Sequence, residues 1–341
     1  MKVLRLKGVG DVELFDEAQP APGPGEALVR VSAVGICGSD LHWFSQGSIG
    51  DARLTRPLVL GHEFGGTVEG GPLDGYRVAV EPAAPDNVCE RCREGNHNLC
   101  PEVRFAGHGT TDGGLREYLV WPTALLHRVP DTFSDGTVAL LEPLGVALHS
   151  LDLGHVHLGN TVAVVGCGPI GLMVVQVARN AGAASIVAVE PLAHRRAAAA
   201  ECGADVVLTP VEAAASAVEV DVAIEVAGND DAVKTSMHLV RAGGRVVLAG
   251  IPDDDMTSFP AALARRKGLT ISMVRRMKDT YPRAISLVQR GAVDLDRLVT
   301  SSFAIGDAPA AFRAAAGREG LKTVVQIGKP SGLSTPKGGP A

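Results

Sequence analysis

The stretch that decides the fold is "TVAVVGCGPIGL", residues 161–172, in which Gly166, Gly168 and Gly171 form the pattern G-x-G-x-x-G. Glycines at these positions permit a tight turn, a close approach of the backbone to a pyrophosphate and close packing of a helix on a strand. The helix expected to begin at Pro169 and Ile170 offers N–H donors and a partial positive charge to that pyrophosphate. The motif is weak alone, but between a strand and a helix it predicts a dinucleotide site.

Apolar runs of strand type continue outward from this stretch and alternate with alanine-rich helical segments. The six runs are residues 161–165, 186–189, 206–208, 222–224, 245–249 and 270–274. Buried strands that alternate with helices predict a doubly wound parallel sheet, here a six-stranded Rossmann domain. A last helix is expected over residues 280–291.

Side chains at the ends of these runs complete the expected cofactor site. Glu190 ends the second run, 19 residues after Gly171, where a carboxylate accepts hydrogen bonds from ribose hydroxyls and repels a 2′-phosphate. This favours NAD over NADP as the cofactor. Arg195 follows, and its guanidinium stacks on adenine, holds a 2′-phosphate, or is simply solvated on a helix. The nicotinamide half of the cleft is expected to be lined by Val226, Ala249 and Gly250.

The first 150 or so residues have a different composition. They are rich in Gly and Pro and contain short β-type runs such as "ALVRVSAV" (27–34) and "YRVAV" (76–80). No long helical period interrupts them, so they predict a compact β-barrel domain whose loops carry reactive side chains. The part after residue 291 returns to β-type texture and is expected to rejoin this domain, while the tail 331–341 has the composition of a disordered segment.

Composition excludes several classes of partner. The chain has 341 residues, 46% of them apolar, and a net charge of −6 without a long basic cluster, which argues against nucleic acid or anionic lipid as a partner. No stretch approaches the roughly 20 apolar residues of a membrane span, and the N-terminus has no apolar signal region. We therefore expect a cytoplasmic protein that acts on a small molecule.

Two groups of residues are candidates for metal binding. Cys37, in "GICGSDLHWF" (35–44), together with His62 and Glu63 of "GHE", offers a thiolate, an imidazole and a carboxylate, a set that suits Zn²⁺ with one position open for substrate. Asp40 could orient the His62 ring from behind. For Cys37 alone, a buried structural thiol is the simpler interpretation. A second group, three cysteines within "CERCREGNHNLC" (89–100), favours metal thiolates over disulfides in a chain without a secretion signal.

With these motifs in hand, the chain resembles the zinc-containing medium-chain alcohol dehydrogenase superfamily over nearly its whole length, most closely its sorbitol (L-iditol 2-) dehydrogenase branch of polyol dehydrogenases. The matching stretches are "GICGSDLHWF", "PLVLGHEFGGTV", "EGNHNLCP", "EPLGVALHS", "GCGPIGL" and "TYPRAISLVQRG". The resemblance implies a GroES-like β-barrel catalytic domain, residues 1–148 and 283–341, and a Rossmann domain, residues 149–282.

The resemblance also implies roles for single residues. Cys37, His62 and Glu63 would hold the catalytic zinc, with Glu142 of "LLEPLGVALH" binding it directly or through water. Ser39 and His42 would relay the substrate's proton to solvent, with Glu142 and water as the other path. A structural zinc would be held where the family has four cysteines, here by Asp86, Cys89, Cys92 and Cys100. Because Asp86 replaces the first cysteine, a lobe without metal, with three reduced thiols, is the alternative.

For the substrate, the resemblance implies a secondary alcohol of a polyol or sugar-derived molecule, oxidised as hydride passes to NAD. The pocket would be lined by Trp43, Phe105, His108 and Arg276. Met277 and Arg275 depart from the branch, which carries an aromatic and an apolar residue there, so sugar acids such as L-idonate, aminocyclitols or inositol-like rings compete with sorbitol; threonine and simple secondary alcohols also remain open.

Three further outcomes follow from the same resemblance. Relatives associate through their nucleotide-binding domains, which implies a homodimer or homotetramer. A zinc-free quinone-reductase-like or crystallin-like protein is disfavoured by the joint presence of Cys37, His62, Glu63 and Glu142. A non-catalytic NAD-binding redox sensor is the alternative from another functional class.

Overall fold

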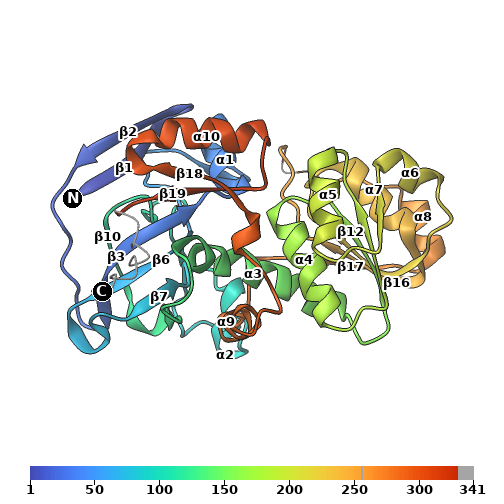
Figure 1. The fold of residues 1–341 in the computed structure, drawn as a ribbon, viewed down its shortest axis with the longest axis horizontal. Coiled ribbons are helices and arrows are strands. Elements are labelled where there is room, and N and C mark those ends of the chain that lie inside the picture. Colours follow the sequence, from blue (N-terminus) through green and yellow to red (C-terminus); the bar gives the residue numbers. More distant parts are fainter. Residues whose placement is uncertain (255, 329–341) are drawn as a thin grey trace, which may run out of the picture.

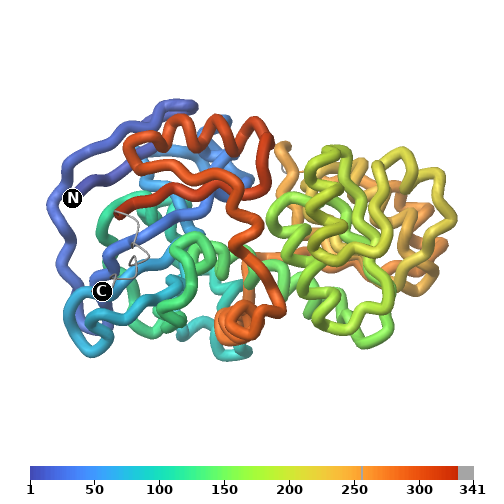
Figure 2. Tube along the Cα trace, in the orientation of Figure 1, coloured from blue at the N-terminus to red at the C-terminus, as the bar shows by residue number. Residues whose placement is uncertain are grey.

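The computed structural model describes residues 1–254 and 256–328, and they form two lobes that lie side by side (Figure 1). The predicted disordered tail, 331–341, lies outside these described residues. The first and last parts of the chain share one lobe, and the middle part forms the other (Figure 2). In the described part of the chain, no helix is long and apolar enough to cross a membrane.

The first lobe is built on a mixed sheet with the strand order β11-β7-β6-β3-β19-β18, and β10 also pairs with β3. Its long central strand β3 hydrogen-bonds to β6, β10 and β19, all antiparallel, so that the last strand of the chain is inserted beside the first large one. The strands of this sheet are β3 (Glu26–Gly35), β6 (Glu63–Glu69), β7 (Arg77–Val80), β10 (Tyr118–Pro122), β11 (Leu126–Arg128), β18 (Val299–Ala304) and β19 (Lys322–Gln326).

Short strand pairs and helices surround this sheet. The pairs are β1 (Lys2–Gly8) with β2 (Asp11–Asp16), β4 (Ser48–Ile49) with β5 (Ala52–Arg53), and β8 (Ala83–Ala84) with β9 (Arg104–Phe105). The helices are α1 (Gly38–Gln46), α2 (Glu90–Arg93) and α10 (Ala308–Gly317), with 3₁₀ turns at Gly71–Leu73, His97–Leu99, Thr123–Leu125 and Ile305–Asp307. An apolar core of β-strand side chains, closed by Phe312 of α10, fills this lobe.

The second lobe confirms the predicted Rossmann fold. Its six strands are all parallel in the order β14-β13-β12-β15-β16-β17. They are β12 (Thr161–Val165), β13 (Ser185–Val189), β14 (Val206–Leu208), β15 (Val220–Glu225), β16 (Val240–Leu248) and β17 (Thr270–Met273). Figure 1 shows α4 and α5 on one side of this sheet and α7 and α8 on the other. The helices are α4 (Pro169–Asn180), α5 (Ala193–Glu201), α6 (Pro210–Ala215), α7 (Asp230–Leu239) and α8 (Ala261–Lys267).

Helix α3 (Asp135–Gly154) corrects the expectation that no long helix interrupts the first 150 residues. It starts at Ser134, whose hydroxyl accepts a hydrogen bond from the Thr137 N–H, and it is apolar on nearly every side. A helix buried all round shows no amphipathic period, and Pro143 inside it further disguises it. It packs on β3 and β6 of the first lobe and on α4 and β15 of the second.

Two smaller corrections concern the first lobe. Residues 38–46, where no helix was expected, form helix α1, and the segment after residue 291, where only β-structure was expected, contains α10 besides its strands. The predicted helix at residues 280–291 is α9 (Tyr281–Gln289), which packs on α3 and is followed by the 3₁₀ turn Asp296–Leu298. The domain boundaries at 148/149 and 282/283 fall inside α3 and α9 and stay a prediction.

Candidate metal centre and dinucleotide site

Three of the predicted metal ligands converge where α1 and β6 begin. Cys37 is the N-cap of α1, while His62 and Glu63 enter β6 after a loop. Their ligand atoms, a sulfur, an imidazole nitrogen and a carboxylate oxygen, all lie within 4.8 Å of one another. A tetrahedral metal bound by these three atoms keeps one position for another ligand. The donor set therefore fits a zinc ion of the catalytic kind.

Asp40 ties the two halves of this cluster together. One of its carboxylate oxygens accepts a hydrogen bond from the Cys37 N–H at 2.9 Å, and the other accepts one from the Gly61 N–H at 3.1 Å. The second oxygen also lies 3.6 Å from His62 Nδ1. Asp40 is 1% exposed, and this burial raises its pKa. The Asp40 carboxylate thus holds the loops of Cys37 and Gly61 together. It faces Nδ1 of the His62 ring, whereas Ser39 lies near Nε2 of the same ring.

The charge of Glu63 is balanced by a residue from the far end of the chain. Lys322, at the start of β19, places its Nζ 2.7 Å from Glu63 Oε1 and 2.5 Å from Oε2, and only Oε1 accepts a hydrogen bond in good geometry. Both side chains are almost completely buried. Although burial opposes it, the charge of Glu63 raises the pKa of Lys322. Oε2 of Glu63 is a buried acceptor without a hydrogen bond of good geometry, although the Lys322 ammonium lies against it.

Glu142 of α3 lies beside this cluster, outside the set of three close ligands. Burial raises its pKa to about 8, and the charge of Glu63 contributes in the same direction. Burial and the same Glu63 charge also raise the pKa of the Cys37 thiol. Burial and mutual repulsion disfavour the ionised forms of these acidic groups. A bound cation would favour the ionised forms and lower their pKa values.

The two residues predicted to relay a proton lie on α1. Ser39 Oγ is 3.3 Å from His62 Nε2, close to the metal ligands. His42 lies one turn further along, where its Nδ1 is 3.6 Å from Asp253 Oδ1 in the loop after β16. The relay residues therefore run from the cluster toward the second lobe, with Asp253 at the outer end.

Aromatic rings and one arginine form the wall around the cluster. The Phe105 ring lies 5.3 Å from the His62 ring, centroid to centroid, and the Trp43 ring lies 5.5 Å from that of His108. The guanidinium of Arg276 sits 4.6 Å from the centre of the Phe105 ring. Of the four predicted pocket residues, Phe105 thus lies against a metal ligand, Arg276 lies over Phe105, and Trp43 and His108 contact each other; their role in binding substrate stays a prediction.

Electrostatics make Arg276 unusual within this wall. Burial lowers the pKa of its guanidinium to about 10, helped by the charge of Arg275, and its backbone has a left-handed φ of 57°. Burial and the charge of Arg276 also lower the pKa of His108. A desolvated guanidinium without a carboxylate partner among the described residues is suited to hold an oxygen-rich ligand.

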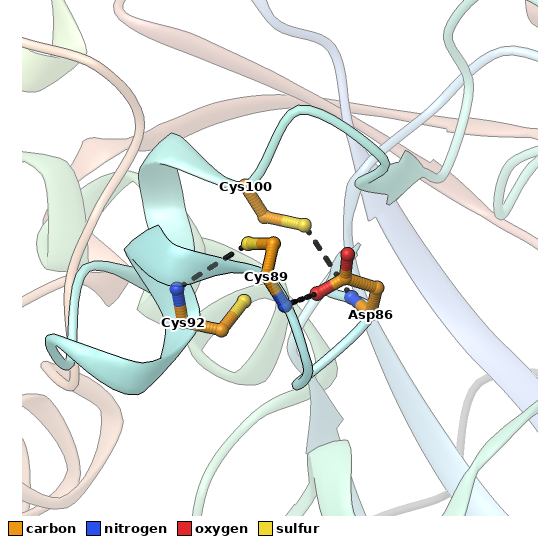
Figure 3. Close-up of side chains that lie close together, drawn as sticks. All are labelled: Asp86, Cys89, Cys92 and Cys100. Carbon is orange, nitrogen blue, oxygen red and sulfur yellow. Dashed lines mark hydrogen bonds between the residues drawn. The ribbon is translucent and has the colours of Figure 1, made fainter.

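The second predicted metal group forms a separate lobe around α2. Asp86, Cys89, Cys92 and Cys100 place their ligand atoms within 4.8 Å of one another, and Figure 3 shows them pointing to a common centre. Asp86 Oδ1 accepts hydrogen bonds from the Val88 and Cys89 N–H groups at 3.0 Å. Cys89 and Cys100 accept from the backbone N–H of Cys92 and Asp86 at 3.4 Å. Four converging ligands fit a closed tetrahedral site, and all six cysteines of the chain are free thiols.

The predicted cofactor residues gather at the carboxyl edge of the Rossmann sheet. Gly166 follows β12 with a φ of 97°, and a Cβ there would lie 2.9 Å from the Ala227 nitrogen. A Cβ on Gly171 would lie 2.0 Å from the Gly166 oxygen, so glycine is required at both positions. Gly168 caps α4, which opens with Pro169 and Ile170, while Val226 follows β15 and Ala249 and Gly250 follow β16. This edge has the backbone cradle that a dinucleotide needs.

Glu190 and Arg195 lie next to the glycine-rich turn. Glu190 is buried, and its carboxylate accepts hydrogen bonds from the Cys167 N–H at 2.8 Å and the Leu192 N–H at 3.0 Å. Arg195 approaches Gly168, and its buried Nε has no hydrogen-bond partner. Burial lowers the pKa of Arg195. The Glu190 carboxylate and the incompletely hydrogen-bonded Arg195 guanidinium thus both lie where the adenosine end of a dinucleotide is expected.

Two residues of the site were missed by the sequence reasoning. Lys322 carries the single charge in the run "KTVVQI", and a single charge in a buried strand is itself a signal of a buried partner. Asp253 carried no such signal, because it lies in the acidic loop "PDDD" and only the three-dimensional fold brings it to His42.

Comparisons with known proteins agree with this geometry. Residues 23–131 match the model of the alcohol dehydrogenase GroES-like domain, and residues 169–290 match that of zinc-binding dehydrogenases. Sorbitol dehydrogenase of Macaca fascicularis is 37% identical, with 95% of each chain covered. A zinc-binding dehydrogenase of Sinorhizobium meliloti, solved with NADP, is 33% identical with a TM-score of 0.88, covering 96% of this chain and 99% of that one. L-Idonate 5-dehydrogenase of Escherichia coli is 28% identical with a TM-score of 0.87, covering 96% and 98%. The chain belongs to the zinc-containing medium-chain alcohol dehydrogenase superfamily, in its sorbitol-dehydrogenase-like branch.

Proposed function

We propose that this dehydrogenase oxidises a secondary alcohol of a polyol or sugar-derived substrate with NAD⁺, and reduces the corresponding ketone with NADH. The observation that carries the proposal is the group Cys37, His62 and Glu63, within 4.8 Å of one another and walled by Phe105 and Arg276. A zinc ion held by these ligands would supply the Lewis acidity that lowers the pKa of the alcohol. The similarity to sorbitol dehydrogenase supports the substrate class.

The chain's own residues would bind the substrate and move its proton. Arg276 donates hydrogen bonds to substrate oxygens from a desolvated position, where such bonds are strong. Ser39 Oγ, close to His62, accepts the alcohol proton as it releases its own hydroxyl proton toward His42, and His42 passes a proton outward, with the Asp253 carboxylate 3.6 Å from its Nδ1. Trp43 and Phe105 exclude water from the reacting carbon.

The test is NADH formation by zinc-loaded protein against polyols, sugar acids, cyclitols, threonine and simple alcohols, with a chelator-treated sample in parallel. Activity on polyols that the chelator abolishes and zinc restores is the expected result. Preference for a sugar acid such as L-idonate would favour the second candidate, which the Arg275–Arg276 pair supports because two guanidinium groups suit a carboxylate. No turnover across the panel despite bound zinc and NADH would contradict the enzymatic proposal.

The cofactor preference is proposed as NAD. Glu190 keeps a carboxylate beside the glycine-rich turn, where it repels a 2′-phosphate, while Arg195 is available to the adenosine. We expect kcat/KM to favour NAD⁺ over NADP⁺ by roughly 100-fold and Glu190→Ser to lower that ratio. A wild-type preference for NADP⁺ would instead assign Arg195 to the 2′-phosphate.

We also propose a homo-oligomer formed through the Rossmann lobe. Strand β17 is the edge of its sheet, with Met273 66% exposed and Ile251 49% exposed nearby. An edge strand that exposes Met273 at its end offers a partner surface for a second copy. Light scattering is expected to give a dimer or tetramer, and Met273→Lys to shift it toward the monomer; a monomeric wild type would contradict the proposal.

A further inference from the structure

A polar pocket lies on the first lobe, apart from the metal cluster. Its volume is about 430 Å³, and it is open to solvent. Three arginines line it, Arg56, Arg104 and Arg116, with the hydroxyls of Thr110 and Thr111 beside them. None of these residues belongs to the metal, cofactor or substrate groups described above.

The positive charge of this pocket exceeds what its carboxylates balance. Asp112 is the carboxylate of the lining, and it is shared by Arg5 at 3.1 Å, Arg56 at 3.6 Å and Arg116 at 4.0 Å. Arg5 is already paired with Glu17. Four arginines therefore meet two carboxylates, in a chain whose net charge is −6.

One of the guanidinium groups is buried with an unsatisfied donor, and another has no ion-pair partner in the described part of the chain. Arg116 has a side chain only 13% exposed, and its Nε is buried without a hydrogen-bond partner. Desolvation lowers the pKa of this arginine, which shows how poorly its charge is solvated. Arg104 has no carboxylate within 4 Å among the described residues and lies instead 5.8 Å from the centre of the Trp121 ring.

We propose that this pocket binds a phosphate-type oxyanion, either free phosphate or the phosphate group of a small metabolite. Guanidinium N–H groups and threonine hydroxyls are the donors that such an anion takes, and a doubly charged anion would balance the excess arginine charge. The pocket has room for such an anion and a few atoms attached to it.

The pocket lies behind the loop that forms the substrate wall. Arg104 and Phe105 are neighbours in β9, so Arg104 turns to the pocket while Phe105 turns to His62. Asp112 Oδ1 also accepts a hydrogen bond from the Val59 N–H at 3.2 Å, three residues before His62. An anion that draws Arg56 and Arg116 away from Asp112 would therefore alter the contacts of the segment that leads to His62.

The experiment is a calorimetric titration of zinc-loaded, NAD⁺-saturated protein with inorganic phosphate, with chloride keeping the ionic strength constant. Saturating NAD⁺ fills the dinucleotide site, which otherwise also accepts phosphate. The variants are Arg104→Gln, Arg116→Gln and, as a matched control on the same lobe, the exposed Arg313→Gln. Glycerol 3-phosphate is the second probe, a phosphate carried by an organic group.

We expect one saturable site in the wild type and in Arg313→Gln, weakened about tenfold in Arg104→Gln and at least as much in Arg116→Gln. If Arg116→Gln does not fold, Arg104→Gln decides the result, because its side chain is exposed. Tighter binding of glycerol 3-phosphate identifies an organic phosphate as the ligand, and equal binding identifies free phosphate. Absence of saturable binding, or equal affinity in all variants, overturns the proposal.

Discussion

The chain carries two clusters of metal-ligating side chains that differ in number and in surroundings. The cluster of Cys37, His62 and Glu63 has three ligands and lies among further charged groups, Lys322 and Glu142. The cluster of Asp86, Cys89, Cys92 and Cys100 has four ligands and is held by backbone N–H groups of its own loop. Three ligands leave a metal open to substrate, whereas four close it. By this difference, we propose that the open cluster serves the reaction and the closed cluster braces its loop.

The largest expected difference is in activity. His62→Ala removes a ligand of the open cluster, and we expect kcat/KM to fall by at least about 1000-fold, because the Lewis acid is lost or misplaced. The control is His238→Ala, an exposed histidine on α7, which should keep full activity. If His62→Ala retained wild-type activity, the open cluster would not be the reaction centre.

Lys322→Met tests the buried partner of the same cluster. Breaking a buried ion pair leaves Glu63 uncompensated, which costs on the order of 3–5 kcal/mol of unfolding free energy. A bound zinc ion would compensate Glu63 instead, so we expect most of this loss in metal-free protein and much less in zinc-loaded protein. Denaturant unfolding with and without zinc measures the difference. An equal loss in both states would mean that Glu63 does not contact the metal.

Cys100→Ser tests the closed cluster, and its expected effect is on stability alone. Loss of one ligand weakens metal binding, and the α2 lobe should lose roughly 3 kcal/mol of its stabilisation. The activity of the folded fraction should stay close to that of the wild type. A loss of kcat in fully folded protein would contradict the assignment of this cluster to bracing.

The comparison also shows what sequence can and cannot predict. The four inner Rossmann strands were predictable because each contains a continuous apolar run followed by Gly or an acidic residue, as expected of strands buried on both faces. Helix α3 was not, because it is buried all round and contains Pro143, so neither period nor propensity marked it. Glu142 could therefore be named as a ligand candidate while the helix that carries it went unrecognised.

At the site, residues close in sequence were easier to predict than partners distant in sequence. Two pairs of residues lie close together in the sequence, Cys37 with Asp40 and His62 with Glu63. Their residue types are those that bind or orient metal ligands, so they already indicate a metal site. The pairing of Glu63 with Lys322 joins residues 259 positions apart, through the insertion of β19 beside β3. No local pattern contains that contact, because it depends on how the last strand returns to the first lobe.

The smallest expected effect concerns the ligand that distinguishes this chain's closed cluster. The N–H groups of Cys89 and Val88 hold the pKa of Asp86 below its ordinary range, so this ligand is ionised at any pH at which the protein is handled. In contrast, burial raises the pKa of Cys92 to about 12, so that thiol must release a proton to bind metal. Asp86→Cys replaces an ionised carboxylate with a further thiol that must lose its proton before it binds metal. Between about pH 6 and 8, the logarithm of its zinc affinity should rise with pH more steeply than in the wild type, by about one per pH unit.

A zinc competition titration with a chromophoric chelator at several pH values measures this slope. The control is Asp86→Asn, which removes the carboxylate charge without adding a titrating group, and which should weaken binding while keeping the wild-type slope. Equal slopes in the wild type and Asp86→Cys would mean that residue 86 does not contact the metal. In that case the lobe would hold its ion, if any, through the three cysteines, and the contrast between an open three-ligand centre and a closed four-ligand one would fail.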